Sequence, residues 1–493
     1  MDLPETIADS AEAVLVKRKT SFAGDVLKLV SGTAIAQFLG IAASPILTRL
    51  YPPEAFGILA LFTSITSILG VMVCMRYELA IMLPESDEEA ANLLGVSLFF
   101  TIIVSLLTVL VVWLVKEPLL YWLNAPGLRP YLWLLPVAVF VSGVFGSLNY
   151  WNSRTKHFGR ISIAQVSRSV LSTSVQLGLG FVGFATGGTL IGASVGGSAL
   201  ATAVLGGQTW REDKKLFLGS IKWQEMLQEI KRYRKFPLYD TWSALLNTAS
   251  WQLPVLMLSS FFSSTIVGYY AFGYRILQIP MSFIGSAIGQ VFFQRASEAH
   301  LRGELAAVVE NTFQRLVMIG LFPMLMLTFI GHDLFAVIFG ATWAEAGVYT
   351  QILSIWAFLW FVSSPLSTIF NTLEKQEFLL KFNMVNFATR FAALYMGGIL
   401  QEPRIAVSLF AGTGVLVYGY LLLSILTAAG VSLHRIVQIL TKPVLMFLPA
   451  GSVLLYLFMA DSKIEIRLLV AGFLLGLYFL FLIKTQFTFN IIK

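Results

Sequence analysis

The chain has 493 residues, of which 57% are hydrophobic and only 12% are charged. Soluble proteins carry about 25% charged residues, so this composition excludes an ordinary soluble protein and indicates a polytopic membrane protein. The net charge of +7 would favour nucleic-acid binding in a soluble chain. Here the basic residues lie between apolar runs and follow from membrane topology, so we expect no nucleic-acid partner.

The N-terminal segment and the few cysteines and histidines argue against a secreted, disulfide-bonded or metal-binding protein. Residues 1–23 are polar and lack an apolar core with a cleavage site, so we expect no secretory signal peptide. A single cysteine, Cys74, and four scattered histidines supply neither a disulfide framework nor a metal site. We therefore expect no cofactor, and proton or sodium coupling stays open.

Fourteen apolar runs in the sequence are candidates for membrane-spanning helices, each of which needs about 20 mainly apolar residues. They start near residues 29, 55, 93, 131, 167, 188, 240, 266, 312, 347, 382, 405, 443 and 466. The glycine-rich stretch 181–197 predicts a tight hairpin between the fifth and sixth helices, because small residues allow close helix packing. The predicted fold is an all-α polytopic membrane protein.

Lysine and arginine set the orientation of these helices. Most lysine and arginine residues fall in segments on one side of the membrane, and the positive-inside rule makes that side cytoplasmic. We therefore expect both termini in the cytoplasm. The loop RYELAIMLPESDEEAANLL (76–94) then lies on the cytoplasmic side between the second and third helices.

The longest hydrophilic stretch lies near the middle of the chain, at 209–239. Trp223, Met226, Leu227 and Ile230 recur there at helical spacing among basic residues. This pattern predicts an amphipathic helix on an anionic membrane surface that links two halves. A plain solvated linker is the alternative.

The two halves are weakly similar to one another. Residues 47–65 align without a gap on residues 258–276, and Gly57 then matches Gly268. Transporters commonly contain such repeats and bind substrate where the repeats meet. The predicted organisation is a cytoplasmic N-terminal segment (1–28), an N-lobe (29–208), a linker (209–239), a C-lobe (240–428) and two added helices (429–493).

The sequence contains no motif for a metal-bound nucleotide sugar, no His-Glu metal motif, no P-loop and no large outward loop. We therefore expect a protein that moves a molecule rather than an enzyme.

Arg275 and Arg390 fall inside spans without an acidic residue within four positions. Charged side chains inside a membrane usually face a cavity, and guanidinium binds phosphate bidentately, so both predict an anionic guest. Structural arginines are the alternative.

Other polar residues near the spans have two interpretations each. Arg76 and Glu78 form either an inner gate or a structural ion pair. Asn247 and Asn386 either contact sugar hydroxyls or form interhelical hydrogen bonds. Three acids precede spans and either accept a coupling proton or stabilise helix N-termini: Asp25, Asp240 and Glu310.

Three stretches resemble a known family: residues 76–94, YYAFGYRILQIPMSFIGSAIGQVFFQRASE (269–298) and LTRLYPPEAFGILALF (47–62). They are similar to the bacterial polysaccharide and lipopolysaccharide (O-antigen) repeat-unit flippases of the multidrug/oligosaccharidyl-lipid/polysaccharide exporter superfamily. The resemblance implies two six-helix lobes in a V around a central cavity and alternating access. It also implies an undecaprenyl-diphosphate-linked oligosaccharide as guest, a bacterial inner membrane, and polysaccharide polymerase and chain-length machinery as partners.

The sequence therefore predicts a flippase for a lipid-linked repeat unit, with Arg76 and Glu78 at its cytoplasmic mouth. A drug or cation antiporter of the same superfamily is the first alternative and would need a buried acid in a lobe. A polysaccharide polymerase or ligase would need a large outward loop. A non-transporting scaffold would tolerate loss of both Arg275 and Arg390.

Overall fold

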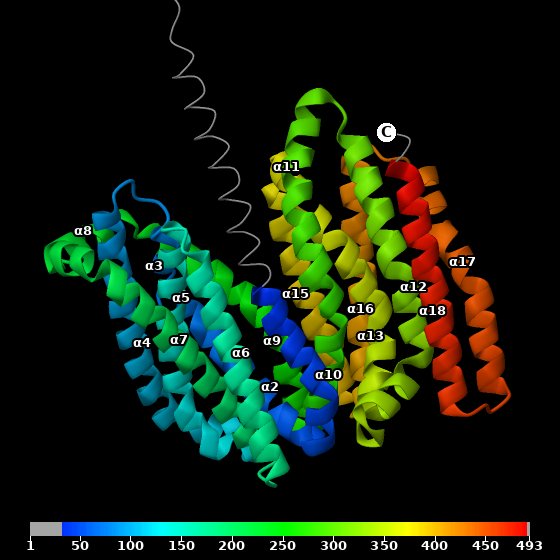
Figure 1. The fold of residues 1–493 in the computed structure, drawn as a ribbon, viewed down its shortest axis with the longest axis horizontal. Coiled ribbons are helices and arrows are strands. Elements are labelled where there is room, and N and C mark those ends of the chain that lie inside the picture. Colours follow the sequence, from blue (N-terminus) through cyan, green and yellow to red (C-terminus); the bar gives the residue numbers. More distant parts are fainter. Residues whose placement is uncertain (1–31, 491–493) are drawn as a thin grey trace, which may run out of the picture. The chain divides into compact units, whose positions relative to one another are not determined.

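The computed structural model describes residues 32–490 of the chain (Figure 1). Every regular element in this range is a helix. Helices satisfy their backbone hydrogen bonds within their own segment, as the interior of a membrane requires. Among the described residues, ten helices are by themselves long and apolar enough to cross a membrane. The predicted all-α, multi-pass membrane fold is confirmed, while the predicted segment 1–28, with Asp25, lies outside the described residues.

Each of the fourteen predicted spans coincides with a helix of the structure. The first is the helix over Gly32–Leu50. The others are α2 (Pro53–Met72), α4 (Asp87–Trp122), η1 with α5 (Pro126–Leu134 and Leu135–Arg154), α6 (Phe158–Phe181), α7 (Gly187–Ser220), α9 (Thr241–Phe261), α10 (Ser264–Leu277), α12 (Leu305–Phe339), α13 (Ala344–Leu366), α15 (Gln376–Ile399), α16 (Pro403–Ala428), α17 (Leu433–Met459) and α18 (Ile464–Asn490).

Shorter helices lie between these spans. Two π-helical turns, η2 (Phe236–Asp240) and η3 (Met281–Gly285), precede α9 and follow α10. The remaining short elements are α3 (Tyr77–Ala80), α8 (Trp223–Arg232), α11 (Ser286–Arg302), η4 (Ala341–Trp343) and α14 (Ile369–Thr372).

The chain divides into two compact units. Unit 1 comprises the chain up to Tyr51 and Leu61–Gln252, and unit 2 comprises Pro52–Ala60 and Leu253–Lys493. The first half of α2 therefore packs with unit 2 and its second half with unit 1. The predicted lobe and linker boundaries stay a prediction.

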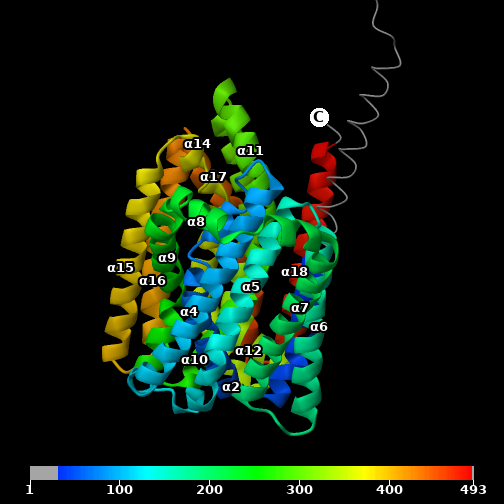
Figure 2. The ribbon, with the colours of Figure 1, turned by 90° about the vertical axis from the view of Figure 1, so that its left-hand side faces the viewer.

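Unit 1 contains α4 to α7, and α4 and α5 lie side by side in it (Figure 2). With 36 residues, α4 is about 54 Å long, whereas the hydrocarbon core of a bilayer is about 30 Å thick. The helix therefore extends beyond the membrane. Ser86 caps its N-terminus by accepting a hydrogen bond from the Glu89 amide at 3.2 Å.

The predicted hairpin around 181–197 is confirmed, since α6 ends at Phe181 and α7 begins at Gly187. A Cβ on Gly197 would lie 2.0 Å from the Ser172 hydroxyl and 2.8 Å from the Arg168 carbonyl. Only glycine allows α6 and α7 to approach this closely. However, α6 begins at Phe158, nine residues before the predicted start near 167, and this difference moves Arg168 into the helix interior.

The predicted amphipathic helix is α8, but it is shorter than the stretch 209–239, because α7 continues to Ser220. Met226 and Ile230 of α8 pack against the core of unit 1 around Tyr77. Trp223 and Leu227 are exposed. One side of α8 thus anchors the helix to unit 1, and its other apolar residues are free to contact the membrane surface.

Unit 2 has an aromatic core in which α2 meets α10. Phe56 packs edge-on against Phe272 and Trp343, with ring centroids 5.7 and 4.9 Å apart. The two glycines that the internal alignment matches, Gly57 and Gly268, contact each other here: a Cβ on Gly57 would lie 3.0 Å from the Gly268 nitrogen. Both glycines are therefore required by backbone-to-backbone packing.

Candidate functional site

A cavity of about 610 Å³ lies within unit 1. Its walls come from α2, α5, α6, α7 and α9, and Arg76 lies at the turn that follows α2. Two cationic side chains line it, Arg76 and Arg168, together with seven hydroxyl side chains: Thr63, Thr66, Ser67, Ser142, Ser194, Ser198 and Thr248. None of the described residues that line it is acidic. The cavity is therefore positively charged and rich in hydroxyl groups.

Arg168, which the sequence analysis did not single out, lies inside α6. It is ten residues beyond Phe158, which corresponds to about 15 Å along the helix axis. Its side chain is exposed and lines the cavity. A charged group at such a depth is costly unless it faces water or a ligand, so Arg168 is the strongest single indication of an anionic guest.

Three of the hydroxyl groups in the cavity donate their hydrogen atoms to carbonyls of their own helices. Thr66 donates to the Phe62 carbonyl at 2.8 Å, Ser67 to the Thr63 carbonyl at 2.7 Å, and Ser198 to the Ser194 carbonyl at 2.8 Å. Such back-bonding leaves the hydroxyl oxygen lone pairs as acceptors. The cavity thus combines arginine donors, which suit phosphate oxygens, with hydroxyl acceptors, which suit the O–H groups of a sugar.

Arg76 is held at the cavity by two carboxylates of unit 1. Its Nε lies 2.7 Å from the Asp240 Oδ2 in η2, and its Nη1 lies 3.6 Å from the Glu78 Oε1. The sequence analysis considered Asp240 only as a proton acceptor or a helix-start residue, and missed this pair because 164 positions separate the two residues. Arg76 has a left-handed φ of 64°, which is uncommon for a residue other than glycine.

Glu78 lies beneath this pair and is buried. Among the described residues its Oε2 has no hydrogen-bond partner. Burial raises the pKa of the Glu78 carboxyl above its ordinary value, Arg76 opposes this rise and Asp240 adds to it. Burial of Glu78 therefore opposes its ionised form, whereas its ion pair with Arg76 favours that form.

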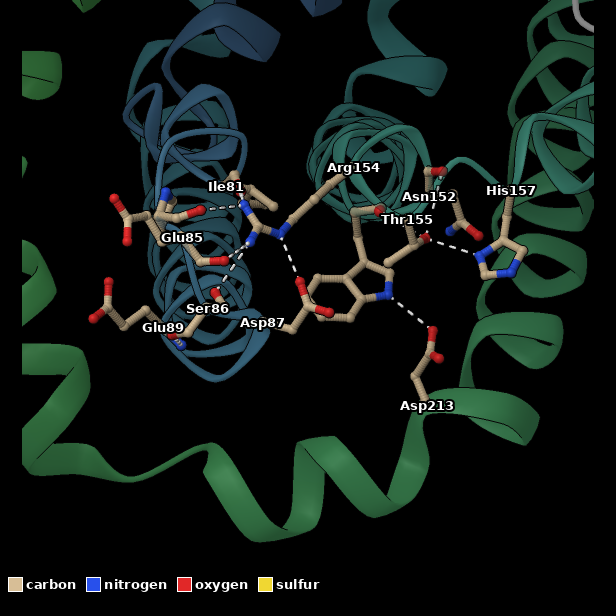
Figure 3. Close-up of polar contacts among 12 residues, drawn as sticks. Ile81, Glu85, Ser86, Asp87, Glu89, Asn152, Arg154, Thr155, His157 and Asp213 are labelled. Atoms are coloured by element: carbon tan, nitrogen blue, oxygen red, sulfur yellow. Dashed lines mark hydrogen bonds and ion pairs between the residues drawn. The ribbon is translucent and has the colours of Figure 1, made fainter. Parts of the chain in front are cut away.

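Arg154, at the end of α5, holds the segment that follows Glu78 (Figure 3). Its guanidinium donates to the Asp87 carboxylate and to four backbone carbonyls, at distances of 2.7–3.3 Å: those of Ile81, Pro84, Glu85 and Ser86. Planar guanidinium can make such a fan of bonds, whereas lysine cannot. Because α5 also lines the cavity, Arg154 fixes the position of the 81–87 segment relative to the cavity wall.

A second polar cluster joins the ends of α5, α6 and α7 (Figure 3). Trp151 donates to the Asp213 carboxylate at 2.9 Å, and Asn152 donates to the Thr209 hydroxyl at 2.8 Å. Arg160, which is buried, pairs with Glu212 and lies 3.7 Å from Asp213. The extension of α7 beyond the membrane is therefore tied to the rest of unit 1.

The predicted site residues of unit 2 differ in solvent exposure: one is exposed and two are buried. Arg275 is exposed on α10, so it does not belong to the packed core of this unit. Arg390 is only 2% exposed, donates to the Tyr418 hydroxyl at 3.1 Å and lies over the Phe410 ring at 5.8 Å. Asn386, one helical turn before Arg390, is also buried. Arg390 and Asn386 are enclosed within unit 2 in this conformation.

The remaining predicted polar residues, Asn247 and Glu310, lie in different surroundings. Asn247 is exposed on α9 next to Thr248, which lines the cavity of unit 1. Glu310 accepts a hydrogen bond from Arg435 at 2.6 Å, so it forms an interhelical ion pair. Among the described residues no cluster of three or more histidine, cysteine, aspartate or glutamate side chains has the geometry of a metal site.

The helix arrangement matches the fold of MOP superfamily transporters. The lipid II flippase MurJ, solved in an inward closed conformation, matches with a TM-score of 0.71 and 12% identity, covering 94% of this chain and 99% of that one. A multidrug resistance MATE family transporter of the MOP superfamily, in an inward-facing conformation, matches with a TM-score of 0.56, 15% identity and coverage of 82% and 94%. A mutant of the Vibrio cholerae MATE transporter VcmN matches with a TM-score of 0.52, 13% identity and coverage of 85% and 98%.

The family follows from the sequence itself. Residues 46–348 match the family described as "Polysaccharide biosynthesis protein". This match covers more than half of the chain, so the chain belongs to the polysaccharide biosynthesis protein family. No curated protein gives a sequence match.

Proposed function

We propose that this protein is a flippase that moves an undecaprenyl-diphosphate-linked oligosaccharide, the repeat unit of a polysaccharide or lipopolysaccharide O-antigen, from the inner to the outer leaflet. The observation that carries the proposal is the cavity of unit 1, with Arg76 and Arg168 and no acid among its described lining residues. Two guanidinium groups match a diphosphate, because guanidinium binds phosphate oxygens bidentately. The hydroxyl acceptors suit the sugar.

In this proposal Arg76 exchanges partners during loading. In the described conformation it is paired with Asp240 at 2.7 Å. An arriving diphosphate competes with Asp240 for the same donors, and Arg168 supplies a second cation deeper in the cavity. An inside-negative potential favours outward movement of the negative guest, by about 2.3 kcal/mol per charge per 100 mV. Glu78, beside Arg76, keeps the inner end of the cavity from holding a surplus of positive charge.

The other predicted contacts have different roles in the proposal. Arg275 and Asn247 are exposed, and in this proposal each contacts the guest at some stage of the transport cycle. Arg390 and Asn386 are buried, and they would contact the guest only after α15 and α16 move. We further propose that the protein lies in a bacterial inner membrane with both termini in the cytoplasm, performs no covalent chemistry, and works beside a polysaccharide polymerase and chain-length machinery.

A drug or cation antiporter is the alternative that this proposal must be tested against. A cationic substrate needs an acidic binding site, whereas the described lining of the unit 1 cavity has two arginines and no acid. Resistance of expressing cells to cationic dyes would favour the antiporter.

The test uses a strain that lacks the gene and carries either the wild type or Arg168→Ala. We expect Arg168→Ala to reach the membrane at the wild-type level but to restore little surface polysaccharide. Arg168→Lys keeps the charge but loses the bidentate guanidinium geometry, so it should restore an intermediate amount. Arg129→Ala is the matched control, because Arg129 forms an exposed ion pair with Glu117 outside the cavity. Wild-type polysaccharide from Arg168→Ala would remove this cavity from the mechanism.

A further inference from the structure

A second cavity, of about 760 Å³, lies within unit 2 between α12 and the first four turns of α17. At one end it is lined by His434, Arg435, Gln438 and Lys442, and Gln314 of α12 faces them. The proposed substrate contacts do not include any of these residues. The cavity therefore requires an explanation of its own.

The polar side chains that α17 contributes to the cavity all lie before Leu445, interspersed with Val437 and Ile439, and the lining of α17 beyond Lys442 is apolar. On α17, residues 434, 438 and 442 share one helical face, since consecutive members are four positions apart. Further along the same helix, the lining changes to Leu445 and Met446, together with Met318 of α12. From Arg435 to Leu445 is about 15 Å along the helix axis. A ligand that fits this gradient has an anionic head and an apolar tail.

Above and below the cavity along the α12 axis, direct contacts hold α17 and α18 to α12. At one end of α12, Arg467 of α18 pairs with the buried Asp333 at 2.8 Å. In the middle, Tyr478 stacks on Phe322 with ring centroids 4.1 Å apart, and Phe447 packs edge-on against Phe322 at 5.4 Å. At the cavity end, Glu310 pairs with Arg435 at 2.6 Å. The cavity occupies the interval between this ion pair and the aromatic contacts.

We propose that this cavity binds one anionic phospholipid, of the phosphatidylglycerol type, from the surrounding membrane. Lys442, His434 and Arg435 face the phosphate, while an acyl chain lies along Leu445 and Met446 toward Phe447. Basic pockets between transmembrane helices on the cytoplasmic side bind such headgroups, and the proposed orientation places the N-terminal end of α17 on that side. The exposed apolar residues Val437 and Leu448 on the same helix face hydrocarbon and admit the lipid laterally.

The charges of the site favour a phospholipid over a zwitterionic lipid or a free anion. Glu310 neutralises Arg435 in part, and no acid is among the described lining residues, so Lys442 supplies an uncompensated positive charge. Inorganic phosphate would occupy the polar end but leave the apolar part of the lining unfilled. The lipid would bridge α12 and α17 where they lack direct packing, which stabilises unit 2.

The experiment adds dioleoyl-phosphatidylglycerol or dioleoyl-phosphatidylcholine to the purified, delipidated full-length protein in detergent. Native mass spectrometry counts bound lipid, and thermal unfolding measures stabilisation. We expect preferential binding of phosphatidylglycerol, and roughly fivefold weaker binding by Lys442→Gln, since one basic residue near an anionic lipid contributes on the order of that factor. Lys463→Gln, an exposed lysine in the connection between α17 and α18, is the control and should bind as the wild type does.

Three results would overturn the proposal. They are equal binding of the two lipids, unchanged phosphatidylglycerol binding by Lys442→Gln, and equal stabilisation by inorganic phosphate, which would show an ion site rather than a lipid site. The readouts involve no transport, so a negative result leaves the flippase proposal untouched.

Discussion

Replacing Arg154 with alanine should release the segment 81–87 from α5 and expose Cys74. The guanidinium holds this segment through one carboxylate and four carbonyls. Cys74 lies just before α3, is buried, and contacts the Thr101 hydroxyl at 3.3 Å and the Ser147 hydroxyl at 3.4 Å. Because α3 connects Cys74 to the released segment, local opening there should uncover the thiol.

The magnitude follows from the bonds that are lost. A hydrogen bond to a charged group contributes about 1.5–3 kcal/mol, but several of these are partly exposed and act together. We therefore expect the free energy that keeps the segment closed to fall by about 2–4 kcal/mol. This change raises the fraction of molecules with an open segment by roughly 30- to 900-fold. Arg154→Lys retains the charge but not the fork, so its effect should lie between those of alanine and the wild type.

The assay is the rate at which a maleimide labels the purified protein. The chain has one cysteine, so the wild type needs no engineering. The expected result is slow labelling of the wild type and of the control Arg129→Ala, and much faster labelling of Arg154→Ala. If Arg154→Ala is labelled as slowly as the wild type, the segment is held by the packing of Tyr77, Ala80 and Ile81, which are at most 1% exposed, and the reasoning from Arg154 is wrong.

Three further predictions concern stability. Because the pKa of Glu78 is raised in the fold, its stabilising contribution is full below the unfolded value of about 4.3 and is lost as pH rises through the folded pKa. The melting temperature of Glu78→Gln should therefore rise relative to that of the wild type as pH increases above about 4.3, and a difference that is the same at every pH would contradict this. Gly57→Ala should lower the melting temperature, since its Cβ would lie 1.7 Å from the Ser264 carbonyl oxygen and overpacking costs about 1–3 kcal/mol, whereas Gly192→Ala, with open space around it, should not. Tyr418→Phe removes the acceptor of Arg390 Nη2 and should destabilise by about 1–3 kcal/mol, measured by thermal unfolding; an unchanged midpoint would show that this hydrogen bond contributes nothing.

The fold could be predicted from the sequence because a membrane imposes long apolar helices. Each of the fourteen predicted runs coincides with a helix, and the hairpin at 181–197 followed from its glycines. Position within a helix was harder to predict. The start of α6 was misplaced because Arg160 and several serines lower the hydropathy of its first turns, so the apolar window began late and Arg168 was not recognised as a charge inside the helix.

The site could be predicted only in part. Arg76 and Glu78 were identified from the loop that carries them, but their partner Asp240 lies far away in sequence. Arg154 could not be found, because most of its acceptors are backbone carbonyls, which leave no sequence signal. Arg390 was identified as a charge within a span, yet whether such a charge faces a cavity or the aromatic core around Phe410 depends on the rotation of α15, which a single sequence does not determine.

The most direct test of the central claim is the membrane leaflet that holds the polyprenyl-linked intermediates. Cells lacking the gene and carrying Arg168→Ala or the wild type would be extracted, and the accessibility of complete lipid-linked repeat units would be measured from each side of the membrane. The proposal predicts complete units trapped on the cytoplasmic face with Arg168→Ala and delivered outward by the wild type. Complete units reaching the outer face without the protein, or incomplete units in its absence, would contradict it.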